Sequence, residues 1–410
     1  METIIKSAED PSAIPEAAEI LKRGGLVAFP TETVYGLGAD ALDATASGRI
    51  YAAKGRPSDN PLIVHIADKA AVYQLAEEVP EKAVLLMEAF WPGPLTIILK
   101  KKEIVPDTTT GGLPTVAIRM PSHPAAMEMI RCSGVYVAAP SANRSGRPSP
   151  TTATHVEQDL SGVIDMILDG GPVGIGIEST IVDLSGEVPM VLRPGYITRE
   201  MLTAIIGDVE LDPSLLEPEL DALKRTVAGT GSGTEVGTGA GTEERTNSGV
   251  KDGTDAEVAT GTDSGTVALD TGMALHPKAP GMRYTHYAPR GELTIVSDGE
   301  HPERVTSKVT TGIRQLAEQA LKDGKITAIL TTGENAKDYE ALDGRQGFHR
   351  ILLGDTDDGQ TVAAHLYAVL RVCDDLGCER IYSENFRRDE LGSAIMNRLV
   401  KAAGHRVIRV

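Results

Sequence analysis

Short runs of β-branched and aliphatic residues, often bounded by glycine or proline, recur along the N-terminal half of the chain. Such runs predict buried strands. They occupy residues 26–30, 95–101, 115–121, 135–140, 166–171, 179–184 and 189–195. Helical patterns, such as those at 15–25 and 123–134, separate only some of these runs. Because several strands follow each other without a helix, the pattern predicts an α/β domain built on one twisted, mixed sheet.

A second set of strand-like runs lies near the C-terminus, at residues 292–298, 326–332, 348–354, 380–386 and 405–410. Helical patterns at 305–324, 361–377 and 391–404 separate several of them. This alternation predicts a smaller, Rossmann-like α/β domain over residues 291–410. Its strand-to-helix turns carry neither G-x-G-x-x-G nor G-x-x-x-x-G-K-[ST], so no conventional dinucleotide or P-loop site is indicated.

Glycine, threonine and acidic residues dominate the segment between these two parts, residues 226–272. No aromatic residue occurs between Tyr196 and Tyr284. A segment of this composition buries too little apolar surface to offset its chain entropy. We therefore predict a flexible, acidic linker over residues 209–280, after a first domain at 1–208.

Net charge argues against a large nucleic-acid interface, and cysteine content favours a reducing compartment. The 410 residues carry a formal net charge of -18, which argues against the clustered cations that a large nucleic-acid backbone footprint needs. Three cysteines, Cys132, Cys373 and Cys378, form no regular framework and fit a reducing cytosol. The last two lie in a helix-like run without zinc-spaced histidines, so buried thiols are favoured over a metal site. With no leader-like or membrane-spanning run, we expect a soluble cytoplasmic protein with no membrane partner.

Polar clusters follow several predicted strands of the first domain. FPTETVYGLGAD, at 29–40, places threonines and Glu32 in a glycine-punctuated turn, which fits either a small polar ligand or local turn hydrogen bonds. KGRPSDNPL, at 54–62, fits either a solvated helix end or an anion clamp stiffened by two prolines. The helix-end interpretation explains Lys54 but not Arg56.

Further clusters appear later in the first domain. His65 alone is more typical of a half-buried strand residue than of a ligand. PSANRSGRPSP, at 140–150, is either a phosphate-binding loop or an exposed Pro/Ser turn. GIEST and VLRPG bring hydroxyls and Arg193 to two more strand ends. Together the clusters indicate catalysis by positioning and charge neutralisation, because no nucleophile–base pair or metal cluster stands out.

These motifs, with FWPGPLT and AIRMPSHP between them, stand in the order typical of the YrdC-like threonylcarbamoyl-AMP synthases, which the first 205 or so residues resemble. PGMRYTHYAP, at 280–289, followed by a small α/β domain, resembles the long, two-domain form. The resemblance implies a YrdC-like catalytic domain with a cationic concave site. It also implies an ordered patch of linker, residues 281–290, over the active site.

The implied activity is that of a nucleotidyltransferase. L-Threonine, bicarbonate or CO₂, and ATP are converted to threonylcarbamoyl-AMP and pyrophosphate, with Mg²⁺ carried on the ATP phosphates and no organic cofactor. A separate transferase complex then modifies the adenosine beside the anticodon of tRNA, so this chain contacts tRNA only indirectly or weakly. The resemblance implies K-x-R and S-x-N catalytic residues at Lys54, Arg56, Ser141 and Asn143.

The same resemblance implies the substrate contacts. Threonine would be surrounded by Thr33, His65, Arg119, Ala139 and Ser179. ATP would be contacted by Arg56, Asn60, Thr115, Ser141, Arg147, Arg193 and either Tyr284 or Tyr287. Arg119 would pair with the threonine carboxylate, and the linker patch would act as a lid that keeps water from the adenylate.

Two alternatives stand beside this interpretation, one from another class and a nearer one that also carries a YrdC-like domain. A non-catalytic RNA-binding module is disfavoured by net charge and by the lack of aromatic platforms among the basic residues. A hydrogenase-maturation carbamoyltransferase would carry an acylphosphatase segment and paired C-x-x-C motifs ahead of the domain, and neither occurs here. The sequence leaves the oligomeric state and the role of the small domain open.

Overall fold

The computed structural model describes residues 2–215, 277–280, 287–301, 304–386 and 390–410. Residues 1–218 and 276–410 form one compact unit with two sheets. Tyr284, most of the expected linker and residues 281–286 of the expected patch lie outside the described residues. The domain boundaries proposed from sequence remain predictions.

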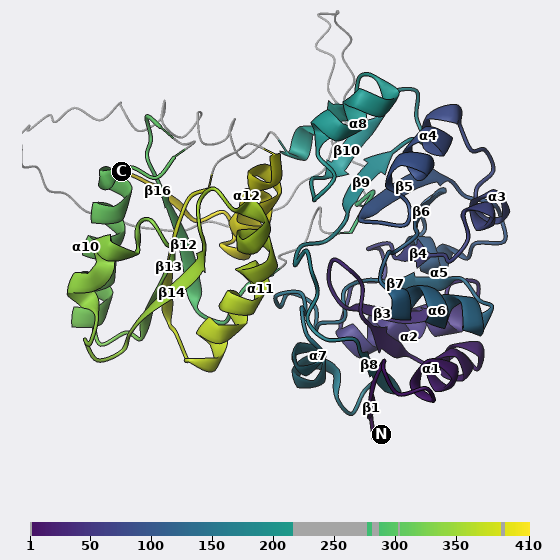
Figure 1. Ribbon diagram of the computed structural model, residues 1–410, viewed down its shortest axis with the longest axis horizontal. Helices are drawn as coiled ribbons and strands as arrows, with labels where there is room; N and C mark the ends of the chain where they lie inside the picture. The colour runs from purple at the N-terminus through teal and green to yellow at the C-terminus, as the bar shows by residue number, and fades with distance from the viewer. Residues whose placement is uncertain (1, 216–276, 281–286, 302–303, 387–389) are drawn as a thin grey trace, which may run out of the picture. The chain divides into compact units, whose positions relative to one another are not determined.

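The larger sheet has 11 strands in the order β1-β8-β2-β3-β7-β4-β6-β5-β9-β10-β11 (Figure 1). Their bounds are β1 Ile4–Ser7, β2 Val27–Phe29, β3 Gly36–Asp40, β4 Ile63–His65, β5 Leu95–Lys100, β6 Thr115–Arg119, β7 Val137–Ala139, β8 Met166–Asp169, β9 Thr180–Asp183, β10 Met190–Arg193 and β11 Glu210–Leu211. Parallel pairs such as β4–β6 stand beside antiparallel pairs such as β5–β6. The mixed sheet expected from sequence is confirmed.

The helices of this part are α1 Ala13–Lys22, α2 Ala44–Lys54, α3 Val72–Leu75, α4 Glu81–Phe90, α5 Asp107–Thr110, α6 Pro124–Ser133, α7 Ala153–Leu160 and α8 Arg199–Ile206, with a 3₁₀ turn at Lys69–Ala71. Alternation along each strand sorts the core into two faces. One face packs under α2, α4, α7 and α8 over the strands from β8 to β10. On the other face, α1 and α6 cover only the β8-β2-β3-β7 end.

The uncovered end of that second face is what positions the site. Its apolar floor consists of Ile63, Ile98, Ala117, Ile181 and Leu192, and Ala279 packs onto it. Side chains two residues along from this floor, such as His65 and Arg119, therefore point to the same open face.

The segment at 36–40 departs from the sequence prediction, which placed it in a turn. It forms β3, between β2 and β7. A Cβ on Gly38 would lie 2.7 Å from Val137 Cγ1 and 2.9 Å from Phe29 Cε1. The glycines are thus needed for close strand packing.

The smaller sheet is parallel throughout, in the order β14-β13-β15-β12-β16. Its elements are β12 Glu292–Ser297, α10 Ser307–Lys322, β13 Thr327–Thr332, the 3₁₀ turn η2 Ala336–Leu342, β14 Phe348–Gly354, α11 Gly359–Asp375, β15 Arg380–Glu384, α12 Glu390–Ala402 and β16 Val407–Arg409. Figure 1 shows α10 on one face and α11 with α12 on the other. The Rossmann-like prediction is confirmed. Cys378, expected within a helical run, lies beyond the end of α11, and both it and Cys373 are buried thiols.

Helix α11 packs against the larger fold at Gly176. This glycine has φ +83°, and a Cβ there would lie 2.3 Å from Ala364 Cα and 2.5 Å from the Ala363 carbonyl oxygen. Both obstacles are backbone atoms of α11, which a side-chain rotation cannot relieve. Gly174 has open space around its position.

We expect Gly176→Ala to lower the free energy of unfolding by roughly 2–4 kcal/mol, because it adds left-handed backbone strain to a backbone clash. Gly174→Ala is the matched control and should change it by less than about 0.5 kcal/mol. Urea denaturation of both variants measures this. Equal stability of the two variants would contradict the packing of α11 on Gly176.

Candidate active site

A pocket of about 690 Å³, counting its open mouth, lies over the exposed part of the sheet. It is lined by Thr31, Thr33, Val34, Gly36, Lys54, Arg56, Ile63, His65, Arg119, Ala139, Pro140, Ser141, Asn143, Ser145, Gly146, Arg147, Glu178, Arg193, Pro280 and Tyr287. Five of these residues are Lys or Arg and one is an acid. The pocket is therefore the cationic concave site expected from sequence.

Three strands side by side supply the polar floor at one end of the pocket. β4 pairs with β6 so that His65 stands opposite Arg119, and with β7 so that Ile63 stands opposite Ala139. Nη1 of Arg119 donates to the Thr33 hydroxyl over 3.0 Å, and Nη2 forms a 2.7 Å ion pair with Glu32. Arg119 is buried, so this fork is held rigidly at the pocket wall.

His65 is buried beside this fork, with its Nδ1 3.0 Å from the Ile63 carbonyl oxygen. Burial, reinforced by the positive charge of Arg119, lowers the pKa of His65 to about 3. The imidazole is therefore neutral near pH 7 and offers a ring nitrogen without adding positive charge.

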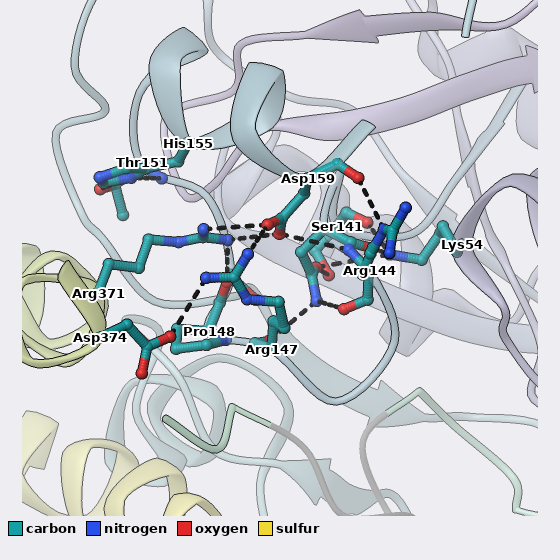
Figure 2. Close-up of polar contacts among 12 residues, drawn as sticks. Lys54, Ser141, Arg144, Arg147, Pro148, Thr151, His155, Asp159, Arg371 and Asp374 are labelled. Carbon is teal, nitrogen blue, oxygen red and sulfur yellow. Dashed lines mark hydrogen bonds and ion pairs between the residues drawn. The ribbon is translucent and has the colours of Figure 1, made fainter. Parts of the chain in front are cut away.

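Lys54 is the last residue of α2, and Gly55 caps the helix in the left-handed conformation at φ 61°. The helix-end interpretation is thus correct, but the side chain is buried rather than solvated. Its Nζ donates to the carbonyl oxygen of Ser141 (Figure 2). It also donates to the carbonyl oxygen of Asn143 and, at 3.5 Å, to Asn143 Oδ1. Burial, and then repulsion from Arg56, holds the pKa of Lys54 well below its usual value. Lys54 therefore fixes the backbone of the S-x-N loop.

The S-x-N side chains continue this network. The Ser141 hydroxyl donates to Asn143 Oδ1 over 2.6 Å, and Asn143 Nδ2 donates to the carbonyl oxygens of Arg144 and Arg147 at 2.7 and 2.9 Å. The loop at 141–147 is therefore folded around Asn143, which orients its arginines.

Arg56 is half-buried, and the backbone of the proline-containing segment that follows it holds its side chain. Its Nε donates to the Asn60 carbonyl oxygen at 3.3 Å and its Nη2 to the Pro61 carbonyl oxygen at 3.1 Å. Burial lowers the pKa of Arg56 to about 10, which still leaves the guanidinium charged at pH 7. Because its partners are neutral carbonyls, its full charge remains available to an anion.

A register shift in β10 brings a further cation, Arg193, to the pocket. The shift between Val191 and Arg193 brings Arg193 opposite Ile181, so its side chain joins the open face. Its Nε and Nη2 donate to the Ser179 carbonyl and hydroxyl oxygens at 3.0 and 3.1 Å, and its Nη1 reaches the Pro280 carbonyl oxygen at 3.4 Å. Ser179 also hydrogen-bonds Thr96 over 2.7 Å.

Glu178, which the sequence interpretation did not select, is the one carboxylate among the lining residues. It accepts hydrogen bonds from Ser149 at 2.6 Å, Tyr367 at 2.9 Å and Arg398 at 3.0 Å. Burial alone would raise its pKa, but the charges of Arg398 and then Arg193 hold the pKa of Glu178 at about 2. Tyr367 and Arg398 are about 190 or more residues away in sequence, so no local signal indicated them.

The pocket brings together Thr33, Lys54, Arg56, His65, Arg119, Ala139, Ser141, Asn143, Arg147, Arg193 and Tyr287 of the residues singled out from sequence. Ser179 and Asn60 lie just behind it, through the contacts with Arg193 and Arg56. Thr115 opens β6, four positions from Arg119, and lies outside the lining. Tyr287 is buried, with its ring centroid 5.1 Å from that of Tyr367.

We expect His65 to keep one chemical environment in NMR between pH 8 and pH 5, because its folded pKa of about 3 lies below that window. In denaturant the same imidazole should titrate near its ordinary value of about 6.5. Since the folded pKa is the lower one, protonation favours the unfolded chain, and stability falls as the pH drops below about 6.5. A folded-state midpoint near 6.5 would contradict this burial.

Glu178→Gln should lower the free energy of unfolding at pH 7 by about 3 kcal/mol, because Arg398 loses a fully charged partner. The folded pKa is depressed, so this stabilisation is present above the ordinary pKa of 4.5 and is lost between pH 4.5 and about 2. The difference between wild type and variant should shrink across that window. Urea unfolding at several pH values measures it, with exposed Glu187→Gln as the control.

Two family models match the chain. The model described as "Telomere recombination" (Sua5_yciO_yrdC) matches residues 19–195, and "Threonylcarbamoyl-AMP synthase, C-terminal domain" matches residues 250–404. The threonylcarbamoyl-AMP synthase of Bacillus subtilis is 42% identical over 98% of this chain and 96% of its own length. That of Pyrococcus abyssi is 39% identical over 96% of this chain and 95% of its own length.

Solved structures agree. P. abyssi Sua5 complexed with L-threonine superposes with a TM-score of 0.77 at 37% identity, covering 100% of both chains. A variant of the same protein gives 0.78 over 100% of this chain and 98% of that one. A mixed sheet with a cationic pocket on its open face, followed by a parallel α/β domain, defines a two-domain protein of the YrdC-like class. Within that class, the chain belongs to the threonylcarbamoyl-AMP synthase family, in its long form.

Proposed function

We propose that this chain joins L-threonine, bicarbonate or CO₂, and ATP into threonylcarbamoyl-AMP, releasing pyrophosphate, and that it is therefore a nucleotidyltransferase. The observation that carries this proposal is the pocket itself. It gathers Lys54, Arg56, Arg119, Arg147 and Arg193 at one polar site in a chain of net charge -18. Such a site suits two anionic reactants that must be brought together.

The threonine subsite we propose is the end of the pocket formed by β4, β6 and β7. Arg119 presents a rigid fork suited to a carboxylate, while Thr33 and neutral His65 offer hydrogen-bonding groups to the amine and hydroxyl. Ala139 leaves room beside Ile63, and Ser179 completes the set through Arg193. Glu32 occupies one side of the Arg119 fork, so a substrate carboxylate would compete with it.

The nucleotide subsite we propose lies toward Arg56, Arg193 and the loop at 141–147. Arg56 and Arg193 are held by carbonyl and hydroxyl oxygens, which leave their charge uncancelled for phosphates. Ser141, Asn60, Thr115 and Tyr287 or Tyr284 remain proposed nucleotide contacts. Pro280 and Tyr287 both line the pocket, and this supports placing the described start of the patch, at Tyr287, near the nucleotide.

The chemistry follows from that placement. The amine of threonine captures CO₂ as a carbamate, a carbamate oxygen attacks the α-phosphorus, and the bond to pyrophosphate breaks. Arg56 and Arg193 neutralise the charge that moves to the leaving group. Lys54 has three N–H bonds and three loop oxygens as partners, so we propose that it acts by fixing the S-x-N loop.

Magnesium enters this proposal as part of the substrate, bound to the ATP phosphates. Among the described residues, no group of three or more His, Cys, Asp and Glu side chains is arranged to hold a metal ion. Glu178, the carboxylate of the pocket lining, is already engaged by Ser149, Tyr367 and Arg398. No organic cofactor is proposed.

The product is a labile mixed anhydride, so we propose that a downstream threonylcarbamoyl transferase complex takes it up and modifies tRNA. Direct tRNA binding by this chain is disfavoured by its acidic charge. Within the described part of the chain no helix has the length and apolar character that crossing a bilayer requires. A cytoplasmic location is proposed because the three cysteines form no regular disulfide framework and fit a reducing compartment.

Purified protein with ATP, Mg²⁺ and bicarbonate should release pyrophosphate in the presence of L-threonine, and much less with L-serine or no amino acid. Arg56→Ala should lower kcat/KM by about 100-fold or more, because a charge that stabilises the leaving group is lost. Arg23→Ala, at the exposed end of α1, is the control for loss of an arginine. If folded wild-type protein released pyrophosphate at the same rate with and without threonine, the proposal would be overturned, and RNA binding would be tested next.

A further inference from the structure

Arg147 is held by two carboxylates that come from distant parts of the chain. Its Nη1 pairs with Asp159 Oδ1 on α7, and its Nη2 lies 3.2 Å from Asp374 Oδ2 on α11 of the small domain. Figure 2 shows the guanidinium of Arg147 between these two acids. Since Arg147 lines the pocket, the small domain contacts a pocket residue directly.

Helix α11 presents a second group to the same loop. Arg371, one helical turn before Asp374, donates through Nη2 to Asp159 Oδ2 at 2.8 Å and to the Pro148 carbonyl oxygen at 2.5 Å. Arg371 is 1% exposed and Asp374 is 7% exposed, so neither side chain is a solvated surface group. Both are committed to the loop that carries Arg147.

The chain just after the linker is tied to the same two points. The backbone N–H of Arg290 donates to Asp374 Oδ1 at 2.6 Å, and that of Ala288 donates to the Gly146 carbonyl oxygen at 2.8 Å. Asp374 therefore bridges the Arg147 side chain and the backbone that follows Tyr287. Its position along α11 fixes both at once.

The two carboxylates restrain the Arg147 guanidinium through Nη1 and Nη2 but leave its Nε–H without a partner in the described part of the chain. The Nε–H of Arg147 is buried and has no acceptor among the described residues. A buried donor of this kind costs free energy until an acceptor meets it, and a phosphate oxygen in the pocket is an anionic acceptor of the required type. Because Arg147 lines the pocket, a phosphate bound in the pocket is an acceptor of this kind at the same site.

We propose that Asp374 of the small domain is a positioning residue for the proposed synthesis, which holds Arg147 toward the nucleotide phosphates with help from Arg371. This inference rests on the proposed function only in taking ATP as the ligand. It gives the small domain a role in nucleotide affinity. Asparagine at position 374 keeps an amide oxygen that accepts from the Arg290 N–H, so the inference predicts that Asp374→Asn affects nucleotide binding through Arg147.

The test compares full-length wild type, Asp374→Asn, Asp375→Asn, Arg147→Ala and the double variant Arg147→Ala/Asp374→Asn. Asp375 is the next residue on α11 and is exposed, so its substitution removes the same charge away from the loop. Isothermal titration with a non-hydrolysable ATP analogue and Mg²⁺ gives Kd, and pyrophosphate release gives kcat and the KM for each substrate.

Asp374→Asn should raise the analogue Kd and the KM for ATP about tenfold, because one charged partner of Arg147 is lost. The KM for threonine and kcat should change less than about twofold. Asp375→Asn should match wild type. The double variant should bind the analogue as Arg147→Ala does, because the Arg147 guanidinium is absent and asparagine still accepts from the Arg290 N–H.

Three results overturn the inference. The first is an Asp374→Asn variant with wild-type Kd, and the second is an equal rise in Asp375→Asn. The third is a further loss in the double variant beyond Arg147→Ala, which would show a general loosening of the fold. If wild type binds the analogue but releases no threonine-dependent pyrophosphate, the proposed function falls while the Kd comparison still decides the role of Asp374. If wild type binds no nucleotide, both fall.

Discussion

The structure depends on burying positive charge at one site without cancelling it. Arg56 and Arg193 are held by carbonyl and hydroxyl oxygens, which satisfy N–H bonds and leave net charge for an anion. Carboxylates meet the other cations, as Glu32 beside Arg119, Glu178 near Arg193, and Asp159 and Asp374 beside Arg147. Removing cations from water is costly, and the hydrogen bonds to these oxygens offset part of that cost. The loops that supply those oxygens are the motifs of the sequence.

The sheet makes this possible because one of its faces is covered only in part. α1 and α6 close the β8-β2-β3-β7 end, and the strands beyond them present His65, Arg119 and Arg193 to the pocket. Alternation along β4 and β6 and the register shift in β10 place all three on that face. The small domain then contacts the same site through α11 and α12, at Arg147 and Glu178. Catalytic loops and small domain are therefore parts of one charge network.

Much of the fold and of the candidate site was accessible from sequence. The apolar runs predicted most strands of both sheets, and the K-x-R and S-x-N motifs identified pocket residues such as Arg56 and Ser141. β3 was missed because its glycines signal a turn locally, whereas their function is to let Phe29 and Val137 pack against the strand. Tertiary packing overrode the local preference there.

The sequence by itself determined the family, the strand pattern and the residues that carry local motifs, because periodicity and spacing are properties of neighbouring residues. Only the tertiary structure decided which charges are cancelled and which are free. Lys54 is committed to a loop 87 or more residues away, and Arg147 is shared between Asp159 and an acid 227 residues away. Glu178 is ionised because Arg398 meets it from the small domain. A pKa and an ion pair depend on distances through space and on burial, and a linear sequence specifies neither until the chain has folded.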